Sequence, residues 1–329
     1  MHLSRENPIL IERKGYSMNK ERCAVFSCMG LGDGLITLTL SNNLFRQGHE
    51  VVTYHPFLEG MQDWFPDLPL KRFPSTEEME QSLASYDKYF ILFEKSPWMS
   101  HIINYCKTHY PDKTTIINPI ATPKTNYPYW ENAKFDGTQP FAGNLAIFCK
   151  QILHCKNPTK DNGIRPLSIY TERKYPCRVI LHPTSSRPGK NWTQDKFLTL
   201  ASRLQKKGFE PCFILSKEER TEWSASTPLA PEFSNLSELA GFVFESGYMI
   251  GNDSGIGHLA SSLGLPTLTI CRSRMTSRFW RPSWSRGSVV CPPSWIPNIK
   301  GFRCRDKHWK KFVPVWTVER AFSKLIQGD

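Results

Sequence analysis

The sequence predicts an α/β protein made of two Rossmann-like domains. The chain has 329 residues, more than one ordinary hydrophobic core holds and enough for two domains of about 150 residues each. Apolar runs typical of strands alternate with helix-like segments in both halves, and the alternation starts afresh at Arg178. Because such alternation is typical of parallel sheets covered by helices, we expect two doubly wound units that face each other across a cleft.

The N-terminal half opens with a strand, a glycine-rich turn, a helix and a second strand. These elements are expected at residues 22–29, 30–34, 35–46 and 50–54, followed by strands at 86–93 and 114–117, a loop at 118–143 and a helix at 145–153. The turn reads GLGDG, but Leu35 replaces the third glycine of a dinucleotide-binding fingerprint. His55 follows the second strand, where that fingerprint requires an acidic residue. A dinucleotide fold is therefore disfavoured.

The second half centres on residues 248–270, which read YMIGNDSGIGHLASSLGLPTLTI. Strands and helices lead up to it at residues 178–181, 196–207, 210–215 and 235–245. Within it, a short strand breaks at a polar loop, a helix follows, and residues 267–270 form another strand. The loop places N–H groups, a hydroxyl and an imidazole at a helix N-terminus, which suits a phosphate group. A plain helix cap formed by Asp253 or Ser254 is the alternative.

Composition narrows the class of protein. No apolar run approaches the roughly 18 residues of a membrane span, and residues 1–20 form a polar leader without the apolar core of a signal peptide. The ten cysteines include no Cys-x-x-Cys pair, so we expect reduced thiols, a cytoplasmic location and no structural metal.

Positive charge is concentrated at the C-terminal end. The chain carries a net charge of +12, and residues 267–329 contain 13 Lys/Arg against 3 Asp/Glu, interleaved with tryptophan and phenylalanine. Nucleic acid, an anionic membrane face or a phosphorylated substrate would suit such a surface. A solvated basic face with no partner is the alternative.

The pattern Asp-Ser-Gly-x-x-His-Leu-Ala-x-x-Leu-Gly-x-Pro-Thr, beginning at Asp253, closely resembles the signature of glycosyltransferase family 9, the heptosyltransferases. The resemblance implies the GT-B architecture of two Rossmann-like domains. We expect a polar leader (1–20), an N-terminal acceptor domain (21–154), a linker (155–176) and a C-terminal nucleotide-sugar domain (177–316). A helix within residues 317–329 is expected to pack back on the N-terminal domain.

The turn around Asp33 resembles the family's Leu-Gly-Asp loop, whose aspartate is regarded as the catalytic base. A carboxylate on a glycine-rich turn facing a cleft can accept the proton of an attacking hydroxyl. The same aspartate could instead cap the following helix.

Residues 182–192, HPTSSRPGKNW, resemble the family's donor-phosphate loop. The resemblance makes Thr184, Ser185 and Lys190 donor-binding residues, because a departing nucleoside diphosphate needs cations and O–H donors where no metal is used. A polar turn with a solvated lysine is the alternative.

The remaining donor residues follow from the same resemblance. Glu219, or in its place Glu218, would bind the ribose hydroxyls. Ser254 and Gly255 would face the diphosphate, Asp253 would accept from sugar hydroxyls, and His258 would orient the loop or contact phosphate.

The acceptor side is expected to involve Gly32 and the arginines Arg272, Arg274 and Arg278. The segment Cys271-Arg272-Ser273-Arg274 departs from the Phe-Gly that many members carry there, so this part of the pocket is expected to be reshaped.

The resemblance thus implies an inverting, metal-independent transferase without a cofactor. Its donor would be a nucleotide sugar, most simply ADP-heptose, and its acceptor a phosphorylated glycolipid or glycan of the lipopolysaccharide core at the inner membrane face. A nucleotide-sugar epimerase on the same fold and a basic nucleic-acid-binding protein are the alternatives, although the sequence contains no known nucleic-acid-binding module.

Overall fold

The computed structural model describes residues 20–118, 135–224, 227–299 and 303–328. The polar leader predicted at residues 1–20 lies outside these ranges except for Lys20, and so does most of the loop predicted at residues 118–143. Among the described residues, no helix combines the length and the apolar character that a membrane span requires.

The first domain is a five-stranded parallel sheet in the order β3-β2-β1-β4-β5. Its strands are β1 (Arg22–Phe26), β2 (Glu50–Tyr54), β3 (Leu70–Lys71), β4 (Lys88–Leu92) and β5 (Thr114–Ile117). The helical segments are α1 (Leu31–Arg46), η1 (Leu58–Trp64), α2 (Met79–Leu83), α3 (Pro97–His109), η2 (Pro111–Lys113) and α4 (Phe141–Gln151). The central strands β1 and β4 are almost fully buried because helices cover the sheet, as parallel sheets require.

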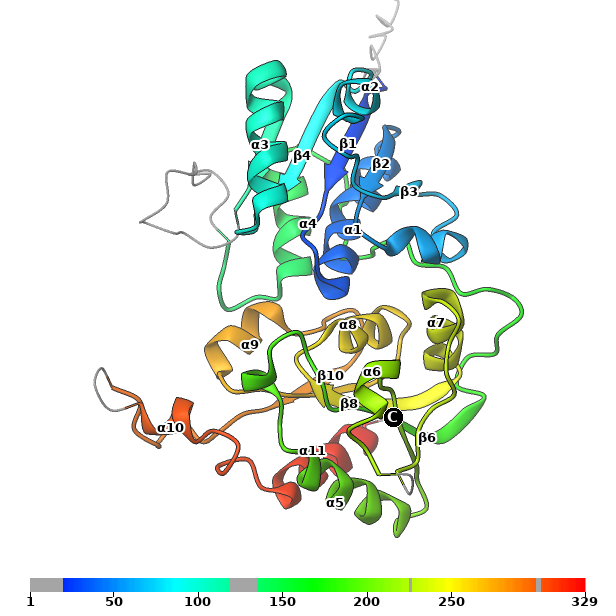
Figure 1. Ribbon diagram of the computed structural model, residues 1–329, viewed down its shortest axis with the longest axis vertical. Helices are drawn as coiled ribbons and strands as arrows, with labels where there is room; N and C mark the ends of the chain where they lie inside the picture. The colour runs from blue at the N-terminus through cyan, green and yellow to red at the C-terminus, as the bar shows by residue number, and fades with distance from the viewer. Residues whose placement is uncertain (1–19, 119–134, 225–226, 300–302, 329) are drawn as a thin grey trace, which may run out of the picture.

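The second domain repeats this plan with a parallel sheet in the order β10-β9-β8-β6-β7. Its strands are β6 (Tyr175–His182), β7 (Glu210–Phe213), β8 (Ser246–Asn252), β9 (Thr267–Ile270) and β10 (Gly287–Val290). The helical segments are η3 (Pro188–Lys190), α5 (Gln194–Gln205), α6 (Lys217–Arg220), α7 (Leu236–Phe244), α8 (Gly255–Ser262), α9 (Arg274–Trp280), α10 (Cys304–Lys307) and α11 (Val315–Ile326). The predicted α/β class with two Rossmann-like domains is confirmed (Figure 1).

The C-terminal helix α11 lies where the sequence did not place it. Its apolar side chains Val318, Phe322 and Leu325 are buried in the core of the second domain, and the helix contacts β10, β9 and α5. Figure 1 shows α11 beside α5 at the end of the molecule far from the first domain. The expectation that this helix packs back on the N-terminal domain is therefore wrong. Amphipathic spacing shows that one face of a helix is buried but not which surface covers it.

The two domains share a hydrophobic cluster. Leu35 and Trp64 of the first domain lie in the same cluster of buried side chains as Ile180 and Leu259 of the second. The indole N–H of Trp64 also donates to Ser237 Oγ at 2.9 Å. Helices α8 and α9 lie on the side of the second domain that faces the first (Figure 1). Continuous apolar burial therefore holds the domains in contact.

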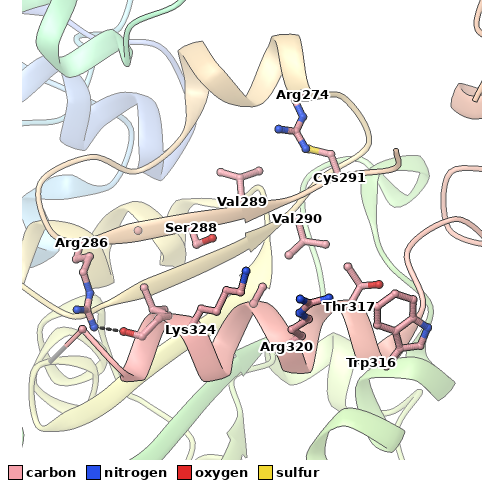
Figure 2. Close-up of a pocket in the computed structure, with 14 residues that line it drawn as sticks. Arg274, Arg286, Ser288, Val289, Val290, Cys291, Trp316, Thr317, Arg320 and Lys324 are labelled. Carbon is pink, nitrogen blue, oxygen red and sulfur yellow. Dashed lines mark hydrogen bonds between the residues drawn. The ribbon is translucent and has the colours of Figure 1, made fainter. Parts of the chain in front are cut away.

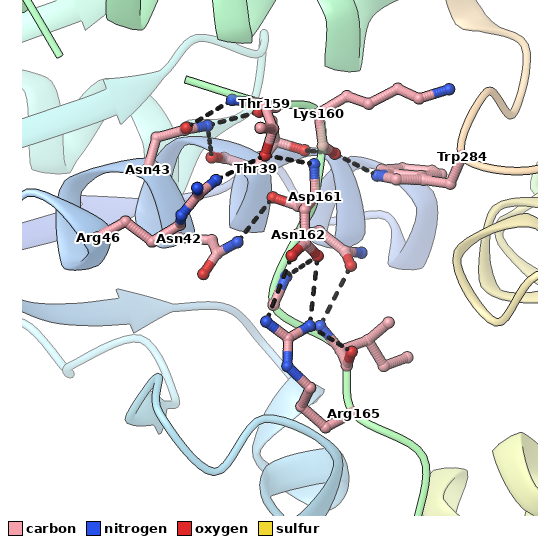
Figure 3. Close-up of polar contacts among 12 residues, drawn as sticks. Thr39, Asn42, Asn43, Arg46, Thr159, Lys160, Asp161, Asn162, Arg165 and Trp284 are labelled. Atoms are coloured by element: carbon pink, nitrogen blue, oxygen red, sulfur yellow. Dashed lines mark hydrogen bonds and ion pairs between the residues drawn. The ribbon is translucent and has the colours of Figure 1, made fainter. Parts of the chain in front are cut away.

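The segment that joins the domains is fixed to α1 by hydrogen bonds (Figure 3). Asn43 pairs with Thr159 in both directions, at 2.7 and 2.9 Å, and Asn42 Nδ2 donates to the Asp161 carbonyl at 3.0 Å. From the second domain, the Trp284 indole N–H donates to the Lys160 carbonyl at 2.6 Å. The linker is thus hydrogen-bonded both to α1 and to the second domain.

Candidate active site

The N-termini of α1 and α8 meet where the domains face each other. A Cβ added at Gly255 would lie 2.7 Å from Leu31 Cβ and 3.1 Å from the Gly32 nitrogen. A Cβ at Gly32 would lie 2.7 Å from the Cδ2 atom of His258. Both positions therefore need glycine for the helix ends to approach this closely. The contact brings the Asp33 turn against the Asp253-Ser254-Gly255 loop, although the two stretches lie far apart in the sequence.

Asp33 lies in the first turn of α1 and does not cap it. Gly30 occupies the N-cap position, and no side chain makes a capping hydrogen bond there. The pKa of Asp33 is raised from 3.8 to about 6, first by burial and then by the negative charges of Glu94 and Asp253, while Lys190 opposes the rise. The predicted alternative of a helix cap does not describe this residue. Its carboxylate is therefore mostly ionised at neutral pH and takes up a proton in mildly acidic solution.

His55 supports the Asp33 turn from beneath. Its Nδ1 accepts the backbone N–H groups of Phe57 and Leu58, both at 3.2 Å, so Nε2 carries the proton and donates to the Gly30 carbonyl at 3.1 Å. Burial lowers the pKa of His55 to about 4, which keeps the ring neutral. Sequence reasoning noted His55 only as the residue that excludes a dinucleotide fingerprint. Its place directly after a predicted strand was the available signal, because such ends border sites in parallel sheets.

Lys190 and Asp253 form an ion pair between the two predicted donor loops. Lys190 Nζ lies 3.1 Å from Asp253 Oδ2, with 37% of the lysine side chain and 19% of the aspartate side chain exposed. The pair joins the loop after β6 to the loop after β8, so the structure brings these two predicted residues together.

A half-buried histidine, His182, lies between two predicted hydroxyl residues. Ser254 occupies the N-cap position of α8, yet its hydroxyl lies 2.9 Å from His182 Nδ1 and makes no capping bond. On the other side of the ring, Thr184 Oγ1 lies 3.4 Å from His182 Nε2. Burial lowers the pKa of His182 to about 4, against a weaker opposing effect of Glu219. Sequence reasoning missed His182 as a site residue, although it ends a predicted strand.

Asn252 is a second residue that sequence reasoning missed. It is buried at the end of β8, where its Oδ1 accepts the Trp192 N–H at 3.0 Å and its Nδ2 donates to the Pro183 carbonyl. Asn252 thus holds both ends of the loop that carries Thr184 and Lys190. No spacing in the sequence marks this role.

Three predicted donor residues have other partners in the structure. The Ser185 hydroxyl donates to Asn191 Oδ1 at 2.6 Å, within its own loop. Glu219 forms a capping box with Ser216, whose N–H it accepts at 2.8 Å. His258 is buried beside Gly32, 6.0 Å from the Trp284 ring centroid, and burial lowers its pKa to about 4. The His258 ring is thus a neutral, buried group packed between α1 and α8.

Glu218, the other ribose candidate, is exposed on α6.

The three predicted acceptor arginines lie on or before α9 and are exposed. α9 contacts the first domain, because Phe279 stacks on Phe141 of α4 at a centroid distance of 5.1 Å. Arg274, however, lines an open pocket of about 810 Å³ between β10 and α11 (Figure 2). This pocket contains none of the predicted donor residues.

Metal-ligating side chains gather elsewhere. Within the described ranges, the group close enough to share an ion is Glu21, Cys23 and His49. These residues lie around the start of β1, whereas the Asp33 turn follows its end. The expectation of a metal-free site remains a prediction.

Two parallel-sheet domains whose polar loops meet at paired helix N-termini define the GT-B class of fold. Residues 154–303, a little under half of the chain, match the model of glycosyltransferase family 9 (heptosyltransferase). The resemblance read from the sequence is confirmed.

Known proteins resemble this chain in sequence and in fold. Lipopolysaccharide heptosyltransferase 3 of Escherichia coli K12 is 24% identical over 167 residues, which are 46% of this chain and 47% of the relative, so the match spans about half of that protein. A family 9 glycosyltransferase from Veillonella parvula DSM 2008 superposes with a TM-score of 0.65 at 15% identity, covering 94% and 98% of the two chains. E. coli ADP-heptose LPS heptosyltransferase II gives 0.63 at 13% identity, covering 93% and 99%. At these identities the structures show the shared fold.

Proposed function

We propose that this protein is an inverting, metal-independent glycosyltransferase that moves heptose from ADP-heptose to a lipopolysaccharide-core or related glycan acceptor. The family 9 domain and the named activities of its relatives support the reaction class, the donor and the acceptor. The observation that carries the proposal is the meeting of Asp33, with its pKa raised to about 6, and the Lys190–Asp253 pair of the other domain.

Asp33 acts as the general base. As the acceptor hydroxyl oxygen forms its bond to the anomeric carbon, Asp33 takes the hydroxyl proton, and the bond from that carbon to the diphosphate oxygen breaks. A single displacement of this kind inverts the anomeric configuration and releases ADP. A pKa of about 6 leaves the carboxylate ionised at neutral pH and makes it a stronger base than an ordinary aspartate.

The second domain stabilises the leaving diphosphate. Lys190 supplies a cation, Thr184 and Ser254 supply hydroxyls, and the N-terminus of α8 at Gly255 supplies backbone N–H groups. When the diphosphate binds, it replaces Asp253 as the partner of Lys190, and Asp253 becomes available to the sugar hydroxyls. His182 orients the Ser254 and Thr184 hydroxyls through its two ring nitrogens.

The acceptor approaches from the first domain and from α9. Gly32 directly precedes the base Asp33, and Arg272 and Arg278 are exposed cations just before and on α9. Helix α9 lies on the side of the second domain that faces the first (Figure 1). Phosphate groups of an acceptor at the cytoplasmic face of the inner membrane would pair with them.

Nucleotide titration followed by an acceptor assay tests this function. With EDTA present, calorimetry should show binding of ADP and much weaker binding of UDP, GDP and CDP. ADP-heptose should then be consumed only when a heptose-accepting core glycan is added. Preference for another nucleoside diphosphate would exclude ADP-heptose as the donor. Conversion of the donor without an acceptor would favour an epimerase, and loss of activity in EDTA would overturn metal independence. Absence of binding to all four nucleotides would overturn the donor site.

A further inference from the structure

The open pocket between β10 and α11 is lined by cations (Figure 2). β10 is the edge strand of the second sheet, and α11 runs beside it. Four positively charged side chains from three segments reach the pocket: Arg274 of α9, Arg286 before β10, and Arg320 and Lys324 of α11. The described lining residues include no aspartate or glutamate.

Helix α11 has three faces with different partners. Val318, Phe322 and Leu325 are buried in the core. Glu319, the single acidic residue of the helix, pairs with Arg203 of α5 at 3.1 Å and with Lys207, just after α5, at 2.7 Å. The third face carries Trp316, Arg320 and Lys324 at a spacing of four residues, so these side chains line one side of the pocket.

The cations of this face are not neutralised by the protein around them. In the part of the chain that the structure describes, no carboxylate lies within ion-pair distance of Arg274, Arg320 or Lys324. Like charges four residues apart on a helix destabilise it by about 0.2–0.5 kcal/mol. Arg286, by contrast, already donates to the Leu325 carbonyl, so the argument rests on the other three.

The pocket has the size and the remaining donors of a ligand site. Its volume of about 810 Å³ falls in the range of small-molecule sites, roughly 300–1,000 Å³. Ser288 and Thr317 contribute hydroxyls to the lining, and the Trp316 ring, 58% exposed, forms one end. Guanidinium groups bind phosphoryl oxygens in a bidentate manner, which suits Arg274 and Arg320.

We propose that the β10–α11 pocket is a second anion site, separate from the donor site, that binds a phosphoryl group. The proposal does not depend on the donor site, because none of the predicted donor residues lines this pocket. Two sources offer the same chemistry: a small phosphorylated solute, or the head group of an anionic phospholipid.

The test uses the full chain and two probes. Inorganic pyrophosphate is titrated by calorimetry, and vesicles of phosphatidylglycerol are compared with vesicles of phosphatidylcholine by co-sedimentation. The variant is Arg320→Gln with Lys324→Gln. The matched control is Lys107→Gln with Lys150→Gln, which removes two exposed charges from helices of the first domain. A conservative variant, Arg320→Lys with Lys324→Arg, keeps the charge and reports any loss due to misfolding.

We expect the pocket variant to weaken one of the two probes about tenfold or more, because two of three unpaired cations are lost. The control and the conservative variant should bind like the parent protein. An effect on pyrophosphate alone identifies a soluble ligand, and an effect on phosphatidylglycerol vesicles alone identifies a lipid head group. If both probes bind the pocket variant as they bind the parent, or if the control loses as much, the proposal is overturned. Pyrophosphate binding that remains in the pocket variant and is lost on replacing Lys190 is binding at the donor site. It does not enter the comparison between the pocket variant and its control.

Discussion

Asp33 and Asp253 lie at the N-terminal ends of corresponding helices, α1 and α8, yet their surroundings differ. Asp253 is paired with Lys190 at 3.1 Å. For Asp33 no cation lies within ion-pair distance among the described residues, and burial with two neighbouring negative charges raises its pKa to about 6. The second domain therefore neutralises the carboxylate of Asp253 with a lysine, whereas the first domain leaves the carboxylate of Asp33 without a paired cation.

This difference separates binding from chemistry. A compensated ion pair costs little to keep and can exchange one anion for another, as donor binding requires. An uncompensated carboxylate destabilises the fold in its ionised form, and this strain is a common property of catalytic acids and bases. The comparison predicts that changes at Asp33 affect the rate, whereas changes in the second domain affect donor affinity.

The largest effect is expected for Asp33→Asn. Removing the general base should lower kcat by about 10²–10⁴-fold while ADP binding stays near that of the parent protein. ADP release in the presence of acceptor measures the rate, and calorimetry measures the binding. The parent rate should also fall about tenfold per pH unit below pH 6, because Asp33 is then protonated. Asp67→Asn, at an exposed carboxylate of the same domain, is the control and should change neither quantity. A variant that kept most of its activity would exclude Asp33 as the base.

Lys190→Ala should have the opposite effect, lowering the affinity for ADP more than the rate of the chemical step. Loss of a charge-assisted contact to the diphosphate is expected to weaken ADP binding by about 10–100-fold, since such contacts contribute about 1.5–3 kcal/mol. Lys206→Ala removes an exposed lysine of the same domain and should leave the affinity unchanged. Equal ADP affinity in the two variants would contradict the role given to the Lys190–Asp253 pair.

Asp33→Asn should also make the protein more stable at neutral pH. The folded pKa lies above the usual value of 3.8, so the folded state favours the protonated form. The stability that this preference contributes is present below pH 3.8 and is lost as the pH rises through about 6. Replacing the ionised group with a neutral amide should therefore raise the free energy of unfolding above pH 6 by about 1–3 kcal/mol. Denaturant titrations at pH 4 and pH 7.5 measure the free energy of unfolding of both proteins. A gain in stability confined to pH 4 would contradict the predicted direction of the pH dependence.

The fold was readable from sequence where strands and helices had clear periodicity. The bounds predicted at residues 114–117 and 267–270 are those of β5 and β9, because β-branched runs flanked by turn residues leave little choice. β10 was not predicted, since a four-residue edge strand after a polar, tryptophan-rich stretch has no pattern of its own. The docking of α11 was predicted wrongly because helical spacing does not identify the partner surface.

The site was only partly readable for the same physical reason. Motif spacing led to Lys190, Asp253 and Ser254, which the structure brings together. Which way a hydroxyl or an imidazole points depends on tertiary packing. Ser185 therefore turned out to bond within its loop, and His258 proved to be buried. His55 and His182 are single residues at strand ends, so no spacing marks them, and only the sheet topology shows what they support.

The smallest effects are expected when the two supporting histidines are replaced. His182→Ala removes the ring that holds the Ser254 and Thr184 hydroxyls, so the KM for the donor should rise about 2–10-fold with kcat nearly unchanged. His55→Ala removes the hydrogen bond to the Gly30 carbonyl behind Asp33, so kcat should fall by a similar factor with ADP affinity retained. Steady-state kinetics and calorimetry on both variants measure the split. His109→Ala, at an exposed position of α3, is the control. If both variants lowered kcat and affinity together, each ring would contribute only to general packing. The division between a catalytic first domain and a binding second domain would then hold only for the residues that touch the substrates.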